Sequence, residues 1–335
     1  MKPLVVVDPL FRRMEDLFGP EDLAALGAVA EVAWGRNGDM PADELARCRD
    51  RAEAIVCGYW KHGSPNDYPK LRVIIEVGGT HPSPKSLDYG ACFARGIQVL
   101  SCAPGFGPAV AEMALALTLA CTRTVVETDR RFRDGSERWL FDETSDSFTL
   151  HDQPVGFIGF GGLARNLRPL LAPFRCPVRV YDPWLADEFL KEQGVEPADL
   201  DSVLSGSRVI YVLAIPTPEN RGLLDRRRLE LIRPGSVLIL ISRAHLVDFG
   251  ALTECVLAGR FRAGVDVFPE EPLPRDHAIR KAPLAVLSSH KAGAMREAMR
   301  LIGRWTVRDL EAVLRGLPPQ YLQPAGLEIV RRMAC

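Results

Sequence analysis

Short apolar runs rich in Val and Ile alternate along the chain with longer segments of helical periodicity. The apolar runs of the first third predict strands at Leu4–Val7, Val29–Ala33, Ala54–Cys57, Val73–Val77 and Gln98–Cys102. The pattern restarts in the second half, with predicted strands at Val155–Ile158, Val178–Tyr181, Val209–Leu213, Val237–Ile241, Gly264–Val267 and Ala285–Ser288. Strands that alternate with helices are typical of parallel sheets covered on both faces. The pattern therefore predicts an α/β protein with two doubly wound parallel-sheet domains.

The segments between these strands differ in character. Ala109–Thr124 is rich in Ala and Leu without Gly or Pro, which predicts a long, mostly buried helix. Its most apolar part contains Glu112 and is expected to fall short of a membrane span. Arg296–Arg315 is a second helix-like segment. Arg130–Asp146 is charged and aperiodic, and we expect an extended surface excursion, either a dimer arm or a solvated loop.

The most specific local pattern is the glycine run of Val155–Ala164. The apolar run ends in Gly159, Gly161, Gly162, Leu163 and Ala164 and passes into a helical pattern, and Asp182 ends the next apolar run. This is the arrangement of a dinucleotide-binding turn. One glycine makes the tight turn, the next lets the backbone approach a pyrophosphate, and Ala164 lets the helix pack on the strand. Asp182 is placed to accept hydrogen bonds from an adenosine ribose, and Pro169 is expected to bend or end the helix.

Composition narrows the class of protein. A hydrophobic content of 47% and a charged content of 25% are typical of a globular protein, and the net charge of −1 argues against nucleic-acid or membrane partners. Eight cysteines occur without CxxC spacing, so no metal or redox motif is indicated and reduced thiols are expected. The apolar N-terminal run is too short for a signal peptide. These features favour a cytoplasmic location.

Three polar residues follow predicted strands of the second sheet and are candidates for catalysis. Arg243, Glu271 and His290 can meet because the carboxyl ends of parallel strands share one edge. An arginine can bind a carboxylate with two hydrogen bonds, and a histidine can transfer a proton near neutral pH. A glutamate bonded to the histidine would orient it and favour its charged form. His245 and His277 are competing histidines, and each residue taken singly is more simply a surface or structural group.

At these residues the chain resembles the D-2-hydroxyacid dehydrogenases, the family of phosphoglycerate dehydrogenase and glyoxylate/hydroxypyruvate reductase. The resemblance rests on Gly96-Ile97, Ala109–Glu112, Thr217–Gly222, Ser242-Arg243, Asp266–Pro272 and Ser289–Gly293, besides the loop Val77–Gly79. It implies that Arg243 and the backbone of Val77, Gly78 and Gly79 bind the substrate carboxylate. It also implies that His290 is the acid/base with Glu271 as its partner.

The same resemblance implies an organisation of domains and a cofactor. The flavodoxin-like substrate domain would comprise residues 1–120 and 297–335, and the inserted Rossmann domain, residues 121–296, would bind NAD. Further cofactor contacts would come from Thr217, Asp266, His290 and Gly293, and relatives suggest a homodimer. No regulatory domain is expected after residue 335.

Several positions depart from the family pattern and put the substrate in question. The family usually has asparagine where this chain has Leu240, glycine where it has Ala244, and an asparagine in the region of Phe106. Tyr59, Trp60 and Phe106 favour an apolar or aromatic substrate tail, or else they pack the core. Lys61 and His62 could instead reach an anionic tail, which keeps phosphohydroxypyruvate as an alternative.

The sequence thus predicts an NAD-dependent enzyme that interconverts a 2-keto acid and a D-2-hydroxy acid. Phosphoglycerate dehydrogenase proper is one alternative. A formate-type dehydrogenase is another, but that subgroup pairs its histidine with glutamine, and Glu271 argues against it. A third is an NAD(H)-sensing protein similar to the family's corepressors, which would bind the cofactor with little turnover.

Overall fold

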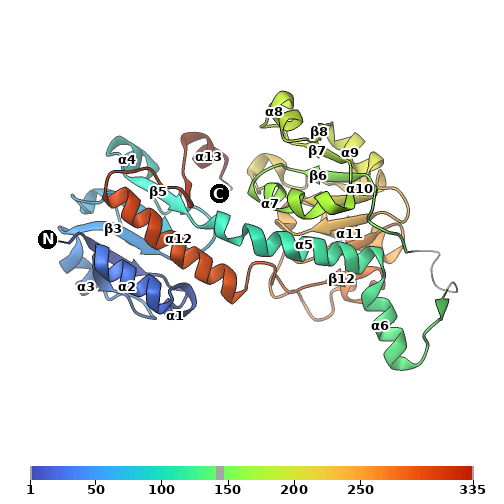
Figure 1. Cartoon of the computed structure of the whole chain (residues 1–335), viewed down its shortest axis with the longest axis horizontal. Coiled ribbons are helices and arrows are strands. Elements are labelled where there is room, and N and C mark those ends of the chain that lie inside the picture. Colours follow the sequence, from blue (N-terminus) through green and yellow to red (C-terminus); the bar gives the residue numbers. More distant parts are fainter. Residues whose placement is uncertain (1, 141–146, 334–335) are drawn as a thin grey trace. The chain divides into compact units, whose positions relative to one another are not determined.

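Every predicted strand has a counterpart in the structure, although the bounds of some are shifted, and the strands form two parallel sheets in two separate compact units. The computed structural model describes residues 2–140 and 147–333. Unit 1 comprises Met1–Gly107 and Ala294–Cys335, and unit 2 comprises Pro108–Gly293. The predicted class, two doubly wound α/β domains, is confirmed (Figure 1).

The sheet of unit 1 has the strand order of flavodoxin-like proteins. Its order is β13-β5-β4-β3-β1-β2, and only β13 is antiparallel to its neighbour. The strands are β1 (Leu4–Asp8), β2 (Glu31–Trp34), β3 (Ala52–Cys57), β4 (Val73–Glu76), β5 (Gln98–Ser101) and β13 (Gln323–Pro324). The order reverses between β1 and β3. In such sheets, ligands bind beside the carboxyl ends of the strands at this reversal.

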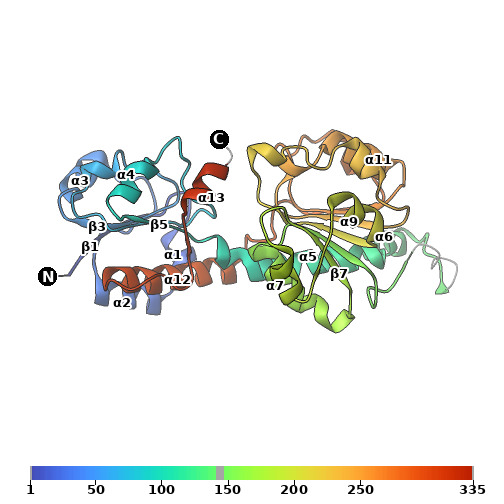
Figure 2. The ribbon, with the colours of Figure 1, turned by 90° about the horizontal axis from the view of Figure 1, so that it is seen from above.

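Helices cover both faces of this sheet (Figure 2). One face carries α1 (Met14–Leu17), α2 (Pro20–Val29) and α12 (Arg296–Leu314), and the other carries α3 (Ala42–Cys48) and α4 (Tyr89–Ala94). The remaining helical elements are η1 (Pro65–Asp67), η2 (Ala103–Phe106) and α13 (Leu327–Arg332). All five residues of β1 are buried, as expected for a strand covered on both sides.

The sheet of unit 2 is wholly parallel and has the strand order of a Rossmann domain. The order is β12-β11-β10-β9-β6-β7-β8, with the reversal between β6 and β9. The strands are β6 (Val155–Ile158), β7 (Val178–Tyr181), β8 (Glu196–Pro197), β9 (Val209–Val212), β10 (Val237–Leu240), β11 (Arg262–Val265) and β12 (Ala285–Leu287). The core consists of two apolar layers, one on each face of the sheet.

The helices of unit 2 contribute to these layers. Those of one layer are α5 (Gly107–Thr122), α7 (Gly162–Leu171) and α8 (Asp187–Glu192), and those of the other are α9 (Leu200–Gly206), α10 (Arg226–Glu230) and α11 (Phe249–Leu257). Helix α6 (Val125–Asp134) follows α5, and the short helices are η4 (Ala172–Phe174), η5 (Pro218–Asn220), η6 (Ala244–Leu246) and η7 (Ala278–Lys281).

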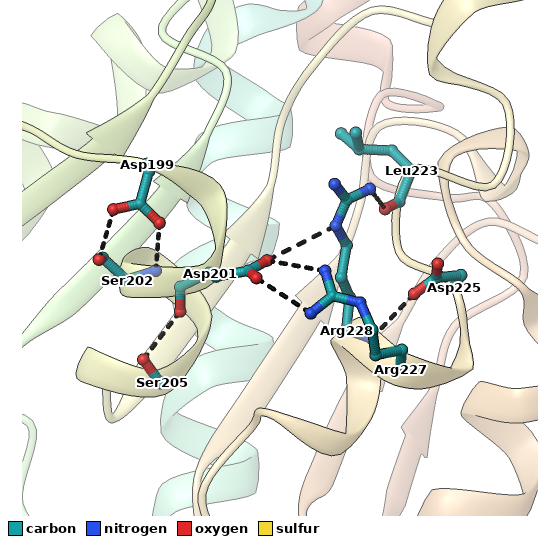
Figure 3. A network of polar contacts seen from close by, with 8 residues as sticks. All are labelled: Asp199, Asp201, Ser202, Ser205, Leu223, Asp225, Arg227 and Arg228. Atoms are coloured by element: carbon teal, nitrogen blue, oxygen red, sulfur yellow. Dashed lines mark hydrogen bonds and ion pairs between the residues drawn. The ribbon is translucent and has the colours of Figure 1, made fainter.

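A polar network joins α9 to the start of α10 (Figure 3). Arg227 donates to both oxygens of Asp201, at 3.0 and 3.3 Å, and Asp199 and Asp225 cap the two helices. Arg228 donates to the carbonyl of Leu223 at 2.8 Å. The network therefore anchors the end of the Thr217–Leu223 segment to helices on one face of the sheet.

The structure corrects the sequence prediction around α5. The predicted domain boundary at residue 120 lies near the end of α5, whereas the unit boundary lies at its start. The reason is that Ala111, Ala114, Leu117 and Cys121 are buried in the core of unit 2. The continuous helical segment Ala103–Thr122 is also long and apolar enough to cross a membrane by length and composition, contrary to the prediction, although half of it is buried.

Other differences are local. The predicted extended segment Arg130–Asp146 begins as the last turns of α6, and residues 141–146 lie outside the described residues. Helix α7 continues past Pro169 to Leu171 before η4 begins, so the proline ends the helix only two residues later. The strands β8 and β13 were not predicted, because two-residue edge strands have no periodicity to read.

Candidate active site

The predicted glycine turn lies between β6 and α7 in unit 2. Gly159 has a φ of 93°, and a Cβ there would lie 2.7 Å from the backbone nitrogen of Ala214, so glycine is required on two counts. At Gly161 and Gly162 a Cβ would meet nothing within 4 Å. Ala164, in the first turn of α7, is fully buried. The turn thus leaves open space in front of the first N–H groups of a ten-residue helix, where an anion can bind.

Asp182 closes the other side of this turn. It follows β7, and its Oδ2 accepts the N–H of Phe160 at 2.8 Å while Oδ1 accepts the N–H of Trp184 at 3.0 Å. Each carboxylate oxygen can accept a second hydrogen bond, so the group retains capacity for a diol. The turn and this acid fit the adenosine and pyrophosphate parts of a dinucleotide.

Asp266 organises the loop that carries His290. Asp266 follows β11 and is fully buried, and its two oxygens accept the N–H groups of Lys291 at 2.9 Å and Ala292 at 3.1 Å. Its carbonyl oxygen accepts the N–H of His290 at 2.8 Å. His290 is held in the left-handed region with a φ of 53°, which a non-glycine residue adopts only when its surroundings fix it. The histidine backbone is therefore rigidly placed after β12.

The imidazole of His290 is bonded to Glu271. The distance from Nδ1 to Oε2 is 2.6 Å, and Oε1 of Glu271 accepts the N–H of Phe268 at 2.9 Å. Burial raises the pKa of Glu271, but the hydrogen bonds from His290 and Phe268 and the charges of His290 and Arg243 bring it below its ordinary value. The carboxylate is therefore ionised and stabilises a positive charge beside it.

Arg243 lies near this pair at the carboxyl end of β10. Its Nη1 donates to the carbonyl of Ser242 at 2.7 Å. Its side chain reaches solvent but is crowded by protein atoms, and burial lowers the pKa of the guanidinium while the charge of Glu271 raises it. An arginine remains protonated in this situation and keeps free N–H donors for an anion. The three predicted residues are thus brought together within unit 2.

The two competing histidines have structural roles. Nε2 of His245 lies 2.7 Å from the carbonyl oxygen of Thr217, whose N–H donates to Asn220 at 2.8 Å. His277 accepts the N–H of Ile279 at 3.2 Å and packs on Phe249. These contacts fix the Thr217 loop and the start of η7.

In unit 1 the predicted substrate residues divide into accessible and buried groups. Gly78 and Gly79 are half-buried, and Phe106 lies over Gly79, whose Cβ would be 3.1 Å from the ring. Tyr59 is 46% exposed. Val77 is buried and its N–H donates to the carbonyl of Cys57 at 2.8 Å, so this N–H belongs to the sheet and is not free for a substrate.

Two further residues are withdrawn from the substrate list. Trp60 is 4% exposed, packs in the core of unit 1 and donates to the carbonyl of Gly63. Of the two roles predicted for this residue, substrate contact or core packing, the structure shows core packing. His62 is 1% exposed and bonds Asp8 at 3.1 Å. Lys61 is paired with Asp8 at 3.2 Å and with Asp39, so its charge is already balanced.

The structure also reveals two residues that sequence reasoning missed, Arg12 and Glu76. Arg12 follows β1 and donates from Nη2 to the carbonyl of Gly78 at 3.1 Å. Glu76 ends β4 and is 3% exposed. The sequence pattern could predict that both residues lie at the carboxyl ends of strands. Nothing in it indicated that both contact the Gly78 loop. In residues 2–140 and 147–333, no cluster of three His, Cys, Asp or Glu side chains could hold a metal.

Comparisons with known proteins agree with this geometry. Residues 115–292 match the model of the D-isomer specific 2-hydroxyacid dehydrogenase NAD-binding domain. A glyoxylate reductase of Thermofilum pendens is 30% identical over 78% of this chain and 77% of its own length. A D-3-phosphoglycerate dehydrogenase of Mycobacterium tuberculosis is 28% identical over 90% of this chain and 56% of its own length.

The chain thus spans about half the length of the curated phosphoglycerate dehydrogenases that it matches. A crystal structure of a phosphoglycerate oxidoreductase from Rhizobium etli superposes with a TM-score of 0.85 and 34% identity, covering 97% of this chain and 99% of that one. The chain therefore belongs to the D-isomer specific 2-hydroxyacid dehydrogenase family, and its second unit contains the family's NAD-binding domain.

Proposed function

We propose that this protein is an NAD-dependent oxidoreductase that interconverts a 2-keto acid and a D-2-hydroxy acid. The observation that carries the proposal is the 2.6 Å contact between His290 Nδ1 and Glu271 Oε2, with Arg243 beside it. The names of the relatives, which include glyoxylate reductase and D-3-phosphoglycerate dehydrogenase, support the same reaction class.

Each of the three residues has a distinct part in this proposal. The guanidinium of Arg243 binds the substrate carboxylate with two hydrogen bonds and so orients the carbonyl carbon. Because Nδ1 of His290 is held by Glu271, Nε2 gives a proton to the carbonyl oxygen in reduction and takes one from the hydroxyl in oxidation. Glu271 stabilises the charged imidazole. The bound NADH supplies the hydride.

We assign the cofactor to the open turn of unit 2. The N–H groups that begin α7, at Gly161, Gly162, Leu163 and Ala164, would hold the pyrophosphate, with Gly159 shaping the turn. Asp182 would bind the adenosine ribose. The nicotinamide end would lie near Thr217, Asp266, His290 and Gly293. Because Asp266 already accepts two N–H groups, any carboxamide contact there would use its remaining lone pairs.

Unit 1 would then be the substrate domain, with the N–H of Gly79 binding the carboxylate, because the Gly78 N–H is already bonded to Glu76. Tyr59 and Phe106 are the accessible aromatic residues and favour an apolar tail. Lys61 would attract an anionic tail only weakly, because its charge is already balanced by Asp8 and Asp39.

We further propose a homodimer in which α6 and the residues after it form the contact. Val125, Val126, Phe132, Trp139 and Leu140 are each more than half exposed, and Phe132 and Trp139 pack on each other at 6.4 Å. Such a group of exposed apolar residues marks an interaction surface. The seven cysteines within residues 2–140 and 147–333 are free thiols and six of them are buried, which supports a reducing, cytoplasmic location.

One experiment tests the reaction. The full chain is titrated with NADH and then assayed for NADH oxidation with glyoxylate, hydroxypyruvate, phenylpyruvate and phosphohydroxypyruvate. Turnover of any of the four supports the proposal, and a tenfold preference in kcat/KM for phosphohydroxypyruvate would replace the apolar tail with an anionic one. NADH binding without turnover of any keto acid would favour a cofactor-sensing protein instead.

A further inference from the structure

The loop Val77–Thr80 of unit 1 is held by charged side chains from two different strand ends. Arg12 comes from the segment after β1, and Glu76 is the last residue of β4. The strand order reverses at β1, and β4 is separated from β1 only by β3. The side chains of Arg12 and Glu76 therefore lie at the carboxyl ends of the strands, where α/β proteins bind ligands. Neither belongs to the Arg243, Glu271 and His290 group.

Arg12 fixes one peptide group of this loop. Its Nη2 donates to the carbonyl of Gly78 at 3.1 Å, and its guanidinium lies 4.6 Å from the ring centre of Phe11 and 5.7 Å from that of Phe106. Because the Gly78 carbonyl and the Gly79 N–H belong to one planar trans peptide, holding the carbonyl also sets the direction of the N–H. The Gly79 N–H is bonded to the Cys102 thiol in this structure, and a carboxylate can displace the sulfur because sulfur is a weak acceptor.

The position of Arg12 is energetically unusual. The guanidinium is half-buried, its Nε has no hydrogen-bond partner, and no carboxylate in the described part of the chain forms an ion pair with it. Burial lowers the pKa of Arg12, and the negative charges of Glu76 and Asp16 only partly offset this. Partly buried cations without an ion pair destabilise a fold, so a role beyond stability explains this residue better.

Glu76 holds the other side of the loop. Its Oε2 accepts the hydroxyl of Thr80 at 3.1 Å, and a Cβ at Gly78 would overlap its carboxylate. Burial raises the pKa of Glu76 to about 7, against the lowering effect of Thr80, the Gly78 N–H and Arg12. The other titratable groups around it are the thiols of Cys57 and Cys102 and the phenol of Tyr89, and burial raises the pKa of all three above the neutral range.

We propose that Arg12 and Glu76 are positioning residues that hold the Gly78–Gly79 peptide in the orientation that binds the substrate carboxylate. This inference rests on the proposed function, because it needs a 2-keto acid at the loop. It assigns no proton transfer to either residue. Their effect is on substrate affinity, because a correctly placed peptide binds substrate and transition state alike.

The first test replaces Arg12 by Met, which packs between the rings but has no donor, and uses Arg13→Met as the matched control. Arg13 is adjacent, and its side chain is 70% exposed. With the best keto acid of the panel, Arg12→Met should raise KM at least about fivefold, the effect of a lost hydrogen bond, and leave kcat within about twofold. The NADH Kd, which reports on unit 2, should not change, and Tm should not fall, because the substitution removes a partly buried cation that has no ion pair among the described residues. Arg12→Lys, which keeps the charge, should recover part of the loss.

The second test concerns the Glu76 side of the loop. Thr80→Val should raise KM, whereas Thr80→Ser, which keeps the hydroxyl, should not. In the wild type, KM should rise as the pH falls through about 7, because protonated Glu76 loses its attraction for Arg12, and Glu76→Gln should abolish this dependence.

The outcomes separate the two proposals. Wild-type turnover with an unchanged KM in Arg12→Met and Thr80→Val would overturn the positioning role alone. Parallel losses of kcat, Tm and NADH binding would show a merely structural role and also overturn it. If the wild type turns over no keto acid, the proposed function fails, and this inference fails with it.

Discussion

Nδ1 of His290 and Oε2 of Glu271 lie 2.6 Å apart, a distance typical of a charge-assisted hydrogen bond. The contact settles which ring nitrogen is available for chemistry. Nδ1 faces the carboxylate and must carry a proton, so Nε2 is the nitrogen that can exchange one with a substrate. The carboxylate is itself held by the N–H of Phe268, and the backbone of His290 is held by Asp266.

Replacing Glu271 by Gln should shift the pH dependence of reduction. Reduction needs a protonated imidazole, and the ionised carboxylate, whose pKa is below its ordinary value, stabilises that state. The loss of keto-acid reduction at high pH should therefore occur at lower pH in Glu271→Gln, as measured by kcat/KM across the pH range. Glu270→Gln is the control because Glu270 is adjacent and exposed. An unchanged profile for Glu271→Gln would refute the pairing.

Replacing His290 by Ala should remove most turnover without removing cofactor binding. A positioned acid/base contributes about 100-fold or more to rate, whereas the glycine turn proposed to bind the dinucleotide lies on another loop. Steady-state assays should show this loss, and NADH fluorescence titration should give a Kd close to that of the wild type. His151→Ala, at an exposed site, should leave both quantities unaltered. Substantial turnover by His290→Ala would exclude the acid/base role.

NADH should be preferred over NADPH by about tenfold or more in kcat/KM. Asp182 is anionic at the position where a 2′-phosphate would lie, and the next residues, Pro183 and Trp184, offer no cation to offset it. The comparison needs both cofactors with one keto acid under the same salt conditions, because screening weakens the repulsion. Equal use of the two cofactors would contradict this prediction.

The stability of unit 1 should depend on the ionisation of Glu76. Because burial raises its pKa from 4.5 to about 7, the folded state binds this proton more tightly than the unfolded state does. Stability should therefore fall as the pH rises from about 4.5 and level off above about 7, by about 3 kcal/mol in all. Glu76→Gln should lack this decline in urea unfolding measured at several pH values. Glu31→Gln, at an exposed ion pair, should retain it.

The proposed homodimer should dissociate when charges are placed on the exposed apolar residues after α5. Phe132→Glu combined with Trp139→Glu introduces carboxylates at side chains that are 63% and 66% exposed, so the fold of the monomer should tolerate them. Sedimentation equilibrium should give a dimer for the wild type and a monomer for the double variant. Leu317→Glu, at a 53% exposed position in unit 1, is the control. A wild-type monomer would exclude the dimer.

The sequence was most informative where local pattern and chemistry coincide. The strands β6 and β7 were predicted with their observed bounds, because a buried parallel strand is a continuous apolar run ended by glycine or an acid. His290 and Glu271 could be paired because residues after neighbouring parallel strands share an edge. For Trp60 the sequence left a substrate contact and core packing open, and the structure shows core packing. The burial of His62 was not predicted, because it depends on Asp8, which lies 54 residues earlier in the chain.

Contacts between distant loops were beyond the reach of sequence patterns. Arg12 and Gly78 are 66 residues apart, and the hydrogen bond between them depends on the close approach of three strand ends. A local pattern cannot reveal such a bond, since any arginine in a loop looks like a solvated one. The helical start of the Arg130–Asp146 segment was missed for another reason: only Arg130–Asp134 of α6 lies in it, and these residues are charged except for Phe132 and too few to show a helical period.

The two hydrogen bonds that Asp182 accepts bear on attempts to redesign the coenzyme. Asp182, which would discriminate against a phosphorylated ribose, also accepts hydrogen bonds from the N–H of Phe160, in the glycine turn, and from the N–H of Trp184. Shortening it to Gly or Ala to admit NADP would leave both N–H groups without their acceptor and loosen the turn that binds either coenzyme. An engineered or evolutionary switch would have to pass through Asn or Ser, which keep one acceptor, and add a cation separately. Because one carboxylate would both select the coenzyme and hold the turn, a single substitution at Asp182 cannot change the coenzyme preference without weakening the turn.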